Sequence, residues 1–164
     1  MVDLDRTKEE PAAQFWDEVE NIPAGMLAIE GSKEHPQPMA PQLDRERGQI
    51  FFFTKKSTDL ARNVGEGRRA HFTIIGRDHD YHACCSGDLR VATERDLIDE
   101  HWSATVGAWF DGKDDPELLL LQFTPLDAAV WASTSSSVVF GWEVLKANIA
   151  NTEPDVSAEA HIKF

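Results

Sequence analysis

Cysteine is scarce in this chain, which has only two, Cys84 and Cys85, adjacent in the sequence. Neighbouring residues of a strand point to opposite faces, so these two thiols are not expected to form a disulfide with each other. A chain of 164 residues without a disulfide framework does not look like a small secreted scaffold. The cysteine content therefore favours a reducing, cytoplasmic compartment.

Long hydrophobic runs are also missing. Runs such as Leu118–Leu121 are far too short to span a bilayer. Residues 1–10 are charged and contain no apolar stretch of the kind that a secretory signal requires. The sequence therefore predicts neither export nor a membrane partner.

Positive charge is in short supply. Lys and Arg number 16 against 29 Asp and Glu, which gives a formal net charge of −13. A surface of this sign repels phosphates, so nucleic acid is not an expected partner. Any phosphate site must be made locally, against the field of the whole protein.

Common catalytic and nucleotide-binding signatures are absent from the sequence as well. It contains no G-x-S-x-G nucleophile elbow and no P-loop. Gly65-Glu66-Gly67 lacks the third glycine and the βαβ context of a dinucleotide fingerprint. These motifs therefore identify no enzyme class.

What is present is a series of short strands with a few helices. Hydrophobic residues make up 41% of the chain, enough for one core. Phe15, Trp16 and Val19 share one helical face, which predicts a helix over residues 9–21 that Pro23 ends. Turn signals then separate strands at 25–29, 36–43, 49–54, 70–75, 81–86, 88–92, 117–124 and 127–132, and helices at 57–64, 93–106 and 138–150.

This order predicts a mainly β fold, an antiparallel barrel with helices packed on its outside. We expect one domain over residues 9–150, after a polar leader at 1–8 and before a polar, loosely ordered tail at 151–164. Gly87 is expected to mark a β-bulge, and Ser57 or Thr58 to cap a helix. Trp16, Trp102 and Trp142, with Leu145, are expected on the inner faces of their helices.

A possible phosphate site follows the apolar strand near residue 50. Thr54, Ser57 and Thr58 offer hydroxyl groups there, and Lys55 and Lys56 offer positive charge. The alternative is a core strand that ends in a solvated turn. On these residues alone the alternative is favoured, because strands commonly end in Lys, Ser and Thr.

The proline-punctuated stretch from Gln37 to Gln42 is expected to be extended. Backbone N–H and C=O groups beside Met39 and Ala40 could form hydrogen bonds with the edge of a planar ring, and the Gln42 side chain could do the same. The alternative, favoured when the stretch is taken alone, is a proline-rich edge strand.

Metal binding is considered for His79, His82 and Cys84, which lie close together in the sequence. Structural zinc needs four ligands, normally from separated pairs, and one hairpin supplies too few. We therefore expect no metal site, and instead solvated turn residues with a buried thiol.

Taken together, residues 9–150 resemble the general stress protein branch of the pyridoxamine 5′-phosphate oxidase-like, FMN-binding split-barrel family. The resemblance rests on the order and spacing of several landmarks: Phe15-Trp16, Gly25-Met26-Leu27, Pro38-Met39-Ala40, Phe52-Phe53-Thr54, Ser86-Gly87, Trp102, Ala108-Trp109-Phe110, Asp114-Asp115-Pro116-Glu117-Leu118 and Trp131. It implies a six-stranded antiparallel split β-barrel that forms a homodimer, with FMN in a cleft at the dimer interface.

The resemblance also implies which residues bind the cofactor. It places Gln37, Met39, Ala40 and Gln42 along the flavin and its ribityl chain, and Thr54, Lys55, Thr58 and Asp59 near the phosphate. Phe53 is also among the residues expected to bind the cofactor. It places His82 near the ring or ribityl chain, and Trp109 is offered by the partner subunit. No residue is assigned as catalytic.

Two positions depart from the family pattern. Gln37 stands where the family has an arginine, and Leu60 where it has a lysine. A charge-assisted hydrogen bond to phosphate is worth roughly 1.5–3 kcal/mol, so two losses weaken FMN by about two to four orders of magnitude. Lys55, Lys56 or Arg62 are the residues that could compensate.

The expected function is therefore that of an FMN-binding general-stress-type protein, with a flavin-dependent oxidoreductase as its enzymatic form. One alternative is a non-catalytic split-barrel dimer that serves as a binding module, or that takes another ligand such as a deazaflavin. A metal-dependent hydrolase using the His79 hairpin is a third. Oxidation of pyridoxamine phosphate is not expected, because no cluster of Arg and His is present to hold that substrate's phosphate.

Overall fold

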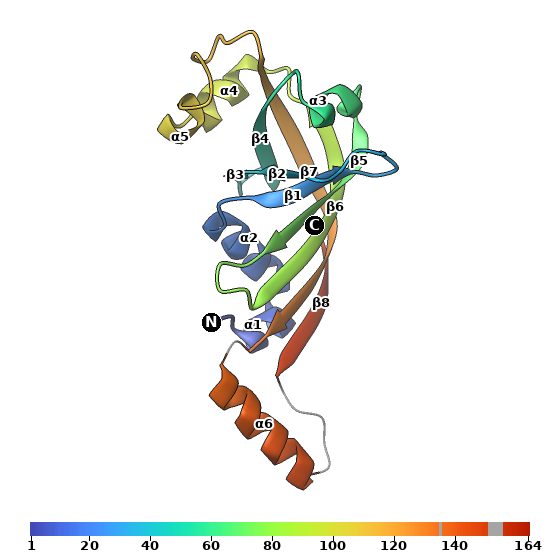
Figure 1. Cartoon of the computed structure of the whole chain (residues 1–164), viewed down its shortest axis with the longest axis vertical. Helices are drawn as coiled ribbons and strands as arrows, with labels where there is room; N and C mark the ends of the chain where they lie inside the picture. Colours follow the sequence, from blue (N-terminus) through green and yellow to red (C-terminus); the bar gives the residue numbers. More distant parts are fainter. Residues whose placement is uncertain (135, 151–155) are drawn as a thin grey trace.

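The computed structural model describes residues 1–134, 136–150 and 156–164. Within these residues eight strands form one antiparallel sheet in the order β2-β1-β5-β6-β7-β4-β3, with β8 also paired to β7 (Figure 1). The strands are β1 (Gly25–Ile29), β2 (Gln37–Met39), β3 (Gln42–Asp44), β4 (Gln49–Lys55), β5 (Arg68–Ile75), β6 (Tyr81–Val91), β7 (Leu118–Ser133) and β8 (Ser157–Lys163). The helices are α1 (Leu4–Glu9), α2 (Pro11–Asn21), α3 (Asp59–Val64), α4 (Arg95–His101), α5 (Ala104–Gly107) and α6 (Ser137–Ala150).

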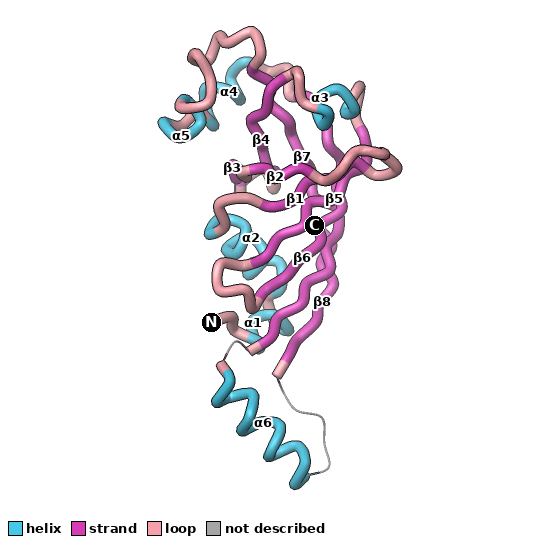
Figure 2. The backbone as a smooth tube through the Cα atoms, viewed as in Figure 1, coloured by secondary structure: helices cyan, strands magenta, loops and turns pink. Residues whose placement is uncertain are grey.

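The predicted fold class is confirmed: the molecule is a curved, mainly antiparallel half-barrel with helices around it (Figure 2). The expected number of six strands is wrong, because the sheet has eight in the described part of the chain. In that same part, no helix combines the length and hydrophobicity needed to cross a membrane.

The core forms because alternate strand residues face the interior. On β5, Ala70, Phe72 and Ile74 are buried, while the residues between them point outward. Phe72 meets Phe52 of β4 edge to face, with ring centroids 5.0 Å apart. Helix α2 adds Phe15 to the same core, which accounts for the helical spacing seen in the sequence.

Strand β4 is covered on both faces. Phe52 points into the barrel core, while Phe51 belongs to a second, smaller cluster with Ala92 and Leu120 under α4. A strand buried on two sides needs apolar residues at successive positions, and this explains its unbroken run of phenylalanines.

The two strands expected at 117–124 and 127–132 are one continuous strand, β7. It pairs with β6 along its length, with β4 over its first part and with β8 over its second. The register shifts between Ser86 and Gly87, opposite Pro125, so the predicted bulge is confirmed. A Cβ at Gly87 would lie 2.5 Å from the Phe123 ring and from the Thr124 carbonyl oxygen, which leaves no space for a side chain.

Both ends of the chain are more ordered than expected. The leader contains α1, capped by the Asp3 side chain, and Val2 and Thr7 are buried. The tail contains β8, where buried Ile162 packs in the main core. Residues 151–155 lie outside the described part. Small and charged residues dominate the sequence of the tail, and only its pairing with β7 reveals a strand.

The expected helix over 93–106 is two helices, α4 and α5, separated at Trp102 and Ser103. The Ser103 hydroxyl caps α5 by accepting from the Val106 amide at 3.2 Å. Helix α6 forms where expected, but Trp142 and Leu145 are 63% and 53% exposed rather than inward. The reason is visible in Figure 1, where α6 extends away from the end of the sheet opposite to α3 and α4.

Replacing Ile162 by alanine tests whether β8 belongs to the folded core. Because Ile162 is 3% exposed, we expect Ile162→Ala to lower the free energy of unfolding by about 2–5 kcal/mol. Urea denaturation measures the change, and Lys163→Ala, at an exposed neighbour, serves as the control. Equal stability of the two variants would mean that the tail does not pack.

Candidate functional site

A pocket of about 590 Å³ lies where β2 and β3 face the end of β4 and the segment that follows α4. Its lining residues are Ala24, Gln37, Pro38, Met39, Ala40, Gln42, Phe53, Thr54, Lys55, Thr58, Thr105, Val106, Trp109 and Phe110. Most of these side chains are apolar or neutral, which suits a mainly apolar ligand with a few polar groups.

Strand pairing sets the position of each wall. Gln37 and Met39 are held on the edge strand β2 by pairing with Leu27 and Gly25 of β1. Gln42 starts β3 and pairs with Phe51 of β4. The extended stretch predicted around the two prolines is therefore divided between two short strands that border the pocket.

An aromatic cluster supports the opposite wall. Trp102 meets Phe53 edge to face at 5.9 Å, and Phe110 lies 6.4 Å from each of them, measured between ring centroids. Trp109 is 73% exposed, so its ring is available to a ligand at the pocket. The break between α4 and α5 lets the chain turn back over Phe53 and form this wall.

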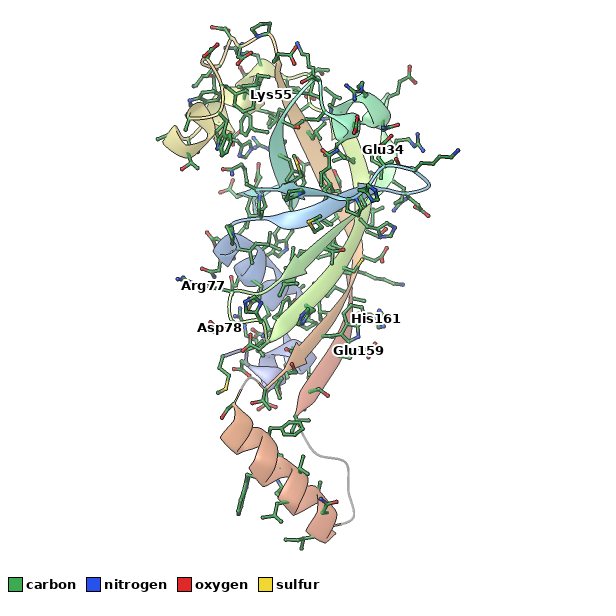
Figure 3. The ribbon with its side chains drawn as sticks, viewed as in Figure 1. Glu34, Lys55, Arg77, Asp78, Glu159 and His161 are labelled. Carbon is green, nitrogen blue, oxygen red and sulfur yellow. The ribbon has the colours of Figure 1, made fainter. Side chains whose placement is uncertain are left out.

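Lys55 is the only lining residue with an ionisable side chain. In the part of the chain that the structure describes, its side-chain ammonium makes no hydrogen bond or ion pair. The other two nearby cations are engaged: Lys56 donates to the Pro116 carbonyl at 2.5 Å, and Arg62 pairs with Asp59. Figure 3 labels Lys55 at the end of β4 close to α4. The pocket thus carries one positive charge without a direct ion pair, although Asp115 is near enough to interact with Lys55 electrostatically.

The neighbouring hydroxyl groups are hydrogen-bonded to one another. Thr54 Oγ1 lies 3.2 Å from Thr58 Oγ1, and Thr58 Oγ1 also donates to the Lys55 carbonyl at 2.9 Å. Thr58 Oγ1 accepts from the Ala61 amide at 3.2 Å, which confirms the predicted helix cap. The Thr58 hydroxyl is therefore already bonded to two backbone groups, whereas the Lys55 ammonium is available to donate to a ligand.

Nine of the eleven residues predicted to bind the cofactor line this single pocket: Gln37, Met39, Ala40, Gln42, Phe53, Thr54, Lys55, Thr58 and Trp109. Trp109, expected from the partner subunit, lines the pocket of its own chain. Thr105, Val106 and Phe110 were not predicted as site residues. Phe110 could have been predicted, because it follows Trp109 in one of the sequence landmarks. Thr105 and Val106 could not, because their position depends on where α4 ends and α5 begins.

Two predicted residues lie elsewhere. The Asp59 carboxylate pairs with Arg62, three residues later on α3. His82 lies on the outward face of β6, opposite Ile75 of β5 and Trp131 of β7. Neither the Asp59 nor the His82 side chain lines the pocket.

The two departures from the family pattern are not equivalent. Gln37 lines the pocket, and an arginine there would reach the same space. Leu60 is 4% exposed and packs in the main core, so its position does not offer a side chain to the pocket in this structure.

Possible metal ligands gather at a different place from the one considered in the sequence. Among the described residues, Asp44, Glu100 and His101 form a group whose ligand atoms all lie within 4.8 Å of one another. His79, His82 and Cys84 form no such group in that part of the chain. The hairpin therefore offers no assembled metal site.

Comparison with known proteins identifies the family. A sequence model described as "Pyridoxamine 5'-phosphate oxidase like" matches residues 10–155. The chain belongs to the pyridoxamine 5′-phosphate oxidase-like family. The resemblance found in the sequence is confirmed.

Relatives within this family include general stress proteins. The chain is 32% identical over 82 residues to general stress protein 26 of Bacillus subtilis strain 168, a match that covers 48% of this chain and 58% of that protein. The matched part thus spans just over half of that relative.

Solved structures agree with the family assignment. A protein described as general stress protein 26 from Jannaschia sp. CCS1 is 35% identical, with a TM-score of 0.79, over 94% of this chain and 99% of that one. The general stress FMN/FAD binding protein of Xanthomonas citri is also 35% identical, with a TM-score of 0.70, over 75% of this chain and 89% of that one.

A lysine at position 60 tests the burial of this position. Leu60→Lys would place an unpaired charge in the main core, so we expect a loss of about 3–5 kcal/mol in the free energy of unfolding. Gln37→Arg, at the partly exposed pocket wall, should stay within about 1 kcal/mol of wild type. Thermal and urea unfolding report both values. A stable Leu60→Lys protein would show that the side chain can leave the core.

Proposed function

We propose that the pocket beside Lys55 binds a flavin, with FMN as the first candidate, and that Lys55 holds the cofactor's phosphate. The observation that carries this proposal is the charge of the pocket. In a protein of net charge −13, this pocket has no acidic lining residue and one lysine without an ion pair. A local positive site of this kind is what an anionic ligand requires against an acidic protein's field.

The size and lining of the pocket also fit a flavin. A volume of about 590 Å³ is within the range of small-molecule sites, about 300–1,000 Å³. Phe53, Trp109 and Phe110 offer aromatic surface to a planar ring, and Gln37 and Gln42 offer amide groups to its polar edge. The X. citri relative described as an FMN/FAD binding protein supports the same assignment.

The residues of this chain would bind and orient the cofactor rather than exchange protons with a substrate. Lys55 is the only ionisable group in the lining, so no carboxylate, imidazole or thiol stands ready as a general base. A bound flavin supplies hydride and electron transfer. The proposed enzymatic form is therefore a flavin-dependent oxidoreductase whose specificity comes from the aromatic wall and the two glutamines.

A second candidate is a binding module that holds its ligand weakly. It is favoured by the neutral Gln37 and by the use of the Thr58 hydroxyl as a helix cap, which leave Lys55 as the main phosphate partner. A planar ligand with less need of phosphate contacts, such as a deazaflavin, would also fit this pocket.

Removing the Lys55 charge tests the flavin proposal. We expect Lys55→Gln to raise the Kd for FMN roughly 10- to 150-fold, the equivalent of one charge-assisted hydrogen bond. Gln37→Arg should lower the Kd by adding a second cation. Quenching of FMN fluorescence measures the Kd for the wild type and for each of these two variants. Lys56→Gln is the matched control, since Lys56 donates to the Pro116 carbonyl and lies outside the pocket lining.

The outcomes separate the two candidates. Wild-type binding that is weakened by Lys55→Gln and unchanged by Lys56→Gln supports a flavin at this pocket. No FMN binding by either wild type or Gln37→Arg contradicts the FMN proposal, and a deazaflavin titration then tests the second candidate.

We also propose that the protein is a homodimer that places this pocket near its interface, in a reducing cytoplasm that suits two free cysteines. Support comes from the outward face of the sheet. Ile75 and Trp131 flank His82 on neighbouring strands and are 50% and 44% exposed. Met26, on β1, is 42% exposed on the same face. Large apolar side chains gathered on one face are typical of a surface that another protein covers.

A charge in the middle of this face tests the dimer. We expect Trp131→Glu to shift the protein from dimer to monomer, because a carboxylate would have to be buried at the interface. Light scattering after size-exclusion chromatography measures the mass. Lys33→Gln alters the net charge by the same amount at an exposed turn and should leave the mass unchanged. A monomeric wild type would contradict the proposal.

A further inference from the structure

A polar cluster outside the pocket joins the end of β3 to the end of α4. It consists of Asp44, Glu100 and His101, which each place one nitrogen or oxygen atom within 4.8 Å of the others. Asp44 ends β3, while Glu100 and His101 end α4, so the cluster depends on the packing of α4 against this part of the sheet.

His101 has a ring nitrogen with no partner. Its ring stacks on Phe51, with centroids 4.2 Å apart and planes 27° from parallel. The Nε2 atom is buried and makes no hydrogen bond within the described residues. Burial lowers the pKa of His101 below its ordinary value. Buried polar atoms are nearly always satisfied, so this nitrogen points to a missing partner.

The two carboxylates share a single cation. Asp44 is buried and accepts from the Arg47 amide at 2.9 Å and from the Arg47 guanidinium. The same guanidinium nitrogen lies 2.9 Å and 3.1 Å from the two oxygens of Glu100. The Arg47 side chain is 51% exposed, so it can leave this position without opening the core.

We propose that Asp44, Glu100 and His101 form a binding site for a divalent transition-metal ion such as Zn²⁺, and that Arg47 is the counter-ion the metal displaces. One imidazole nitrogen with two carboxylate oxygens is a suitable donor set for such an ion, with water in the remaining positions. The ion's two positive charges would balance the two carboxylates and fill the role that Arg47 has in this structure.

The site lies behind a wall of the pocket. Gln42, at the other end of β3, lines the pocket, and Trp102, next to His101, packs on Phe53. An ion held by residues of both β3 and α4 would therefore fix α4 against the sheet. This position gives the ion a structural role close to the pocket, and the metal site itself does not depend on which ligand the pocket takes.

Calorimetric titration of the chelator-treated full chain with Zn²⁺, without flavin, tests the proposal. We expect one ion per chain, and at least about tenfold weaker binding in Glu100→Gln and in His101→Phe, which keeps a ring to stack on Phe51. Arg47→Ala should tighten binding by about tenfold or more, because it removes the competing cation. Circular dichroism establishes that each variant is folded.

A second arginine provides the matched control. Arg45 bridges Asp17 and Glu20 at 2.7 Å each, as Arg47 bridges Asp44 and Glu100. Neither Asp17 nor Glu20 belongs to the proposed metal site. Arg45→Ala should therefore leave Zn²⁺ binding unchanged. Absence of binding in both wild type and Arg47→Ala would overturn the proposal. So would binding that persists in folded Glu100→Gln and His101→Phe, since the ion would then lie elsewhere.

Discussion

The burial of β4 on both faces is the constraint on which the rest of the structure depends. One face closes the barrel core through Phe52, and the other receives α4 through Phe51 and Phe53. Because the strand is fixed from both sides, its last residues are fixed too, and Lys55 emerges at a defined point beside the aromatic wall. The pocket is therefore a consequence of how the second small core is packed, and the break between α4 and α5 is part of that packing.

Charge then distinguishes two neighbouring polar sites, the pocket beside Lys55 and the cluster of Asp44, Glu100 and His101. At the pocket, neutral side chains surround one lysine that lacks an ion pair in the described structure, which favours an anionic ligand. At the end of β3, two carboxylates and an imidazole lie close to one half-exposed arginine, which favours a cation. In a protein with a net charge of −13, a locally positive pocket is unusual, whereas a cluster of carboxylates agrees with the overall charge.

Much of the fold could be read from the sequence because the signals were local. The alternation in β5, the cap at Thr58 and the bulge at Gly87 each depend on residues close in sequence. The continuity of β7 and the presence of β8 could not be read in this way. Pro125 looks like a strand end until the register between β6 and β7 is seen to shift beside it, and β8 has no large apolar residue apart from Ile162. Long-range pairing decides both features.

The sequence by itself determined the fold class, the family and most of the residues that line the pocket, since motif order and hydrophobic period are written along the chain. Only the tertiary structure decided which of those side chains face the same space. In that structure His82 lies on the outward face of the sheet and Leu60 is buried. Asp59 forms an ion pair with Arg62, and Asp44 lies close to His101. The physical reason is that side-chain direction depends on strand register and helix packing, which residues far apart in the sequence set together.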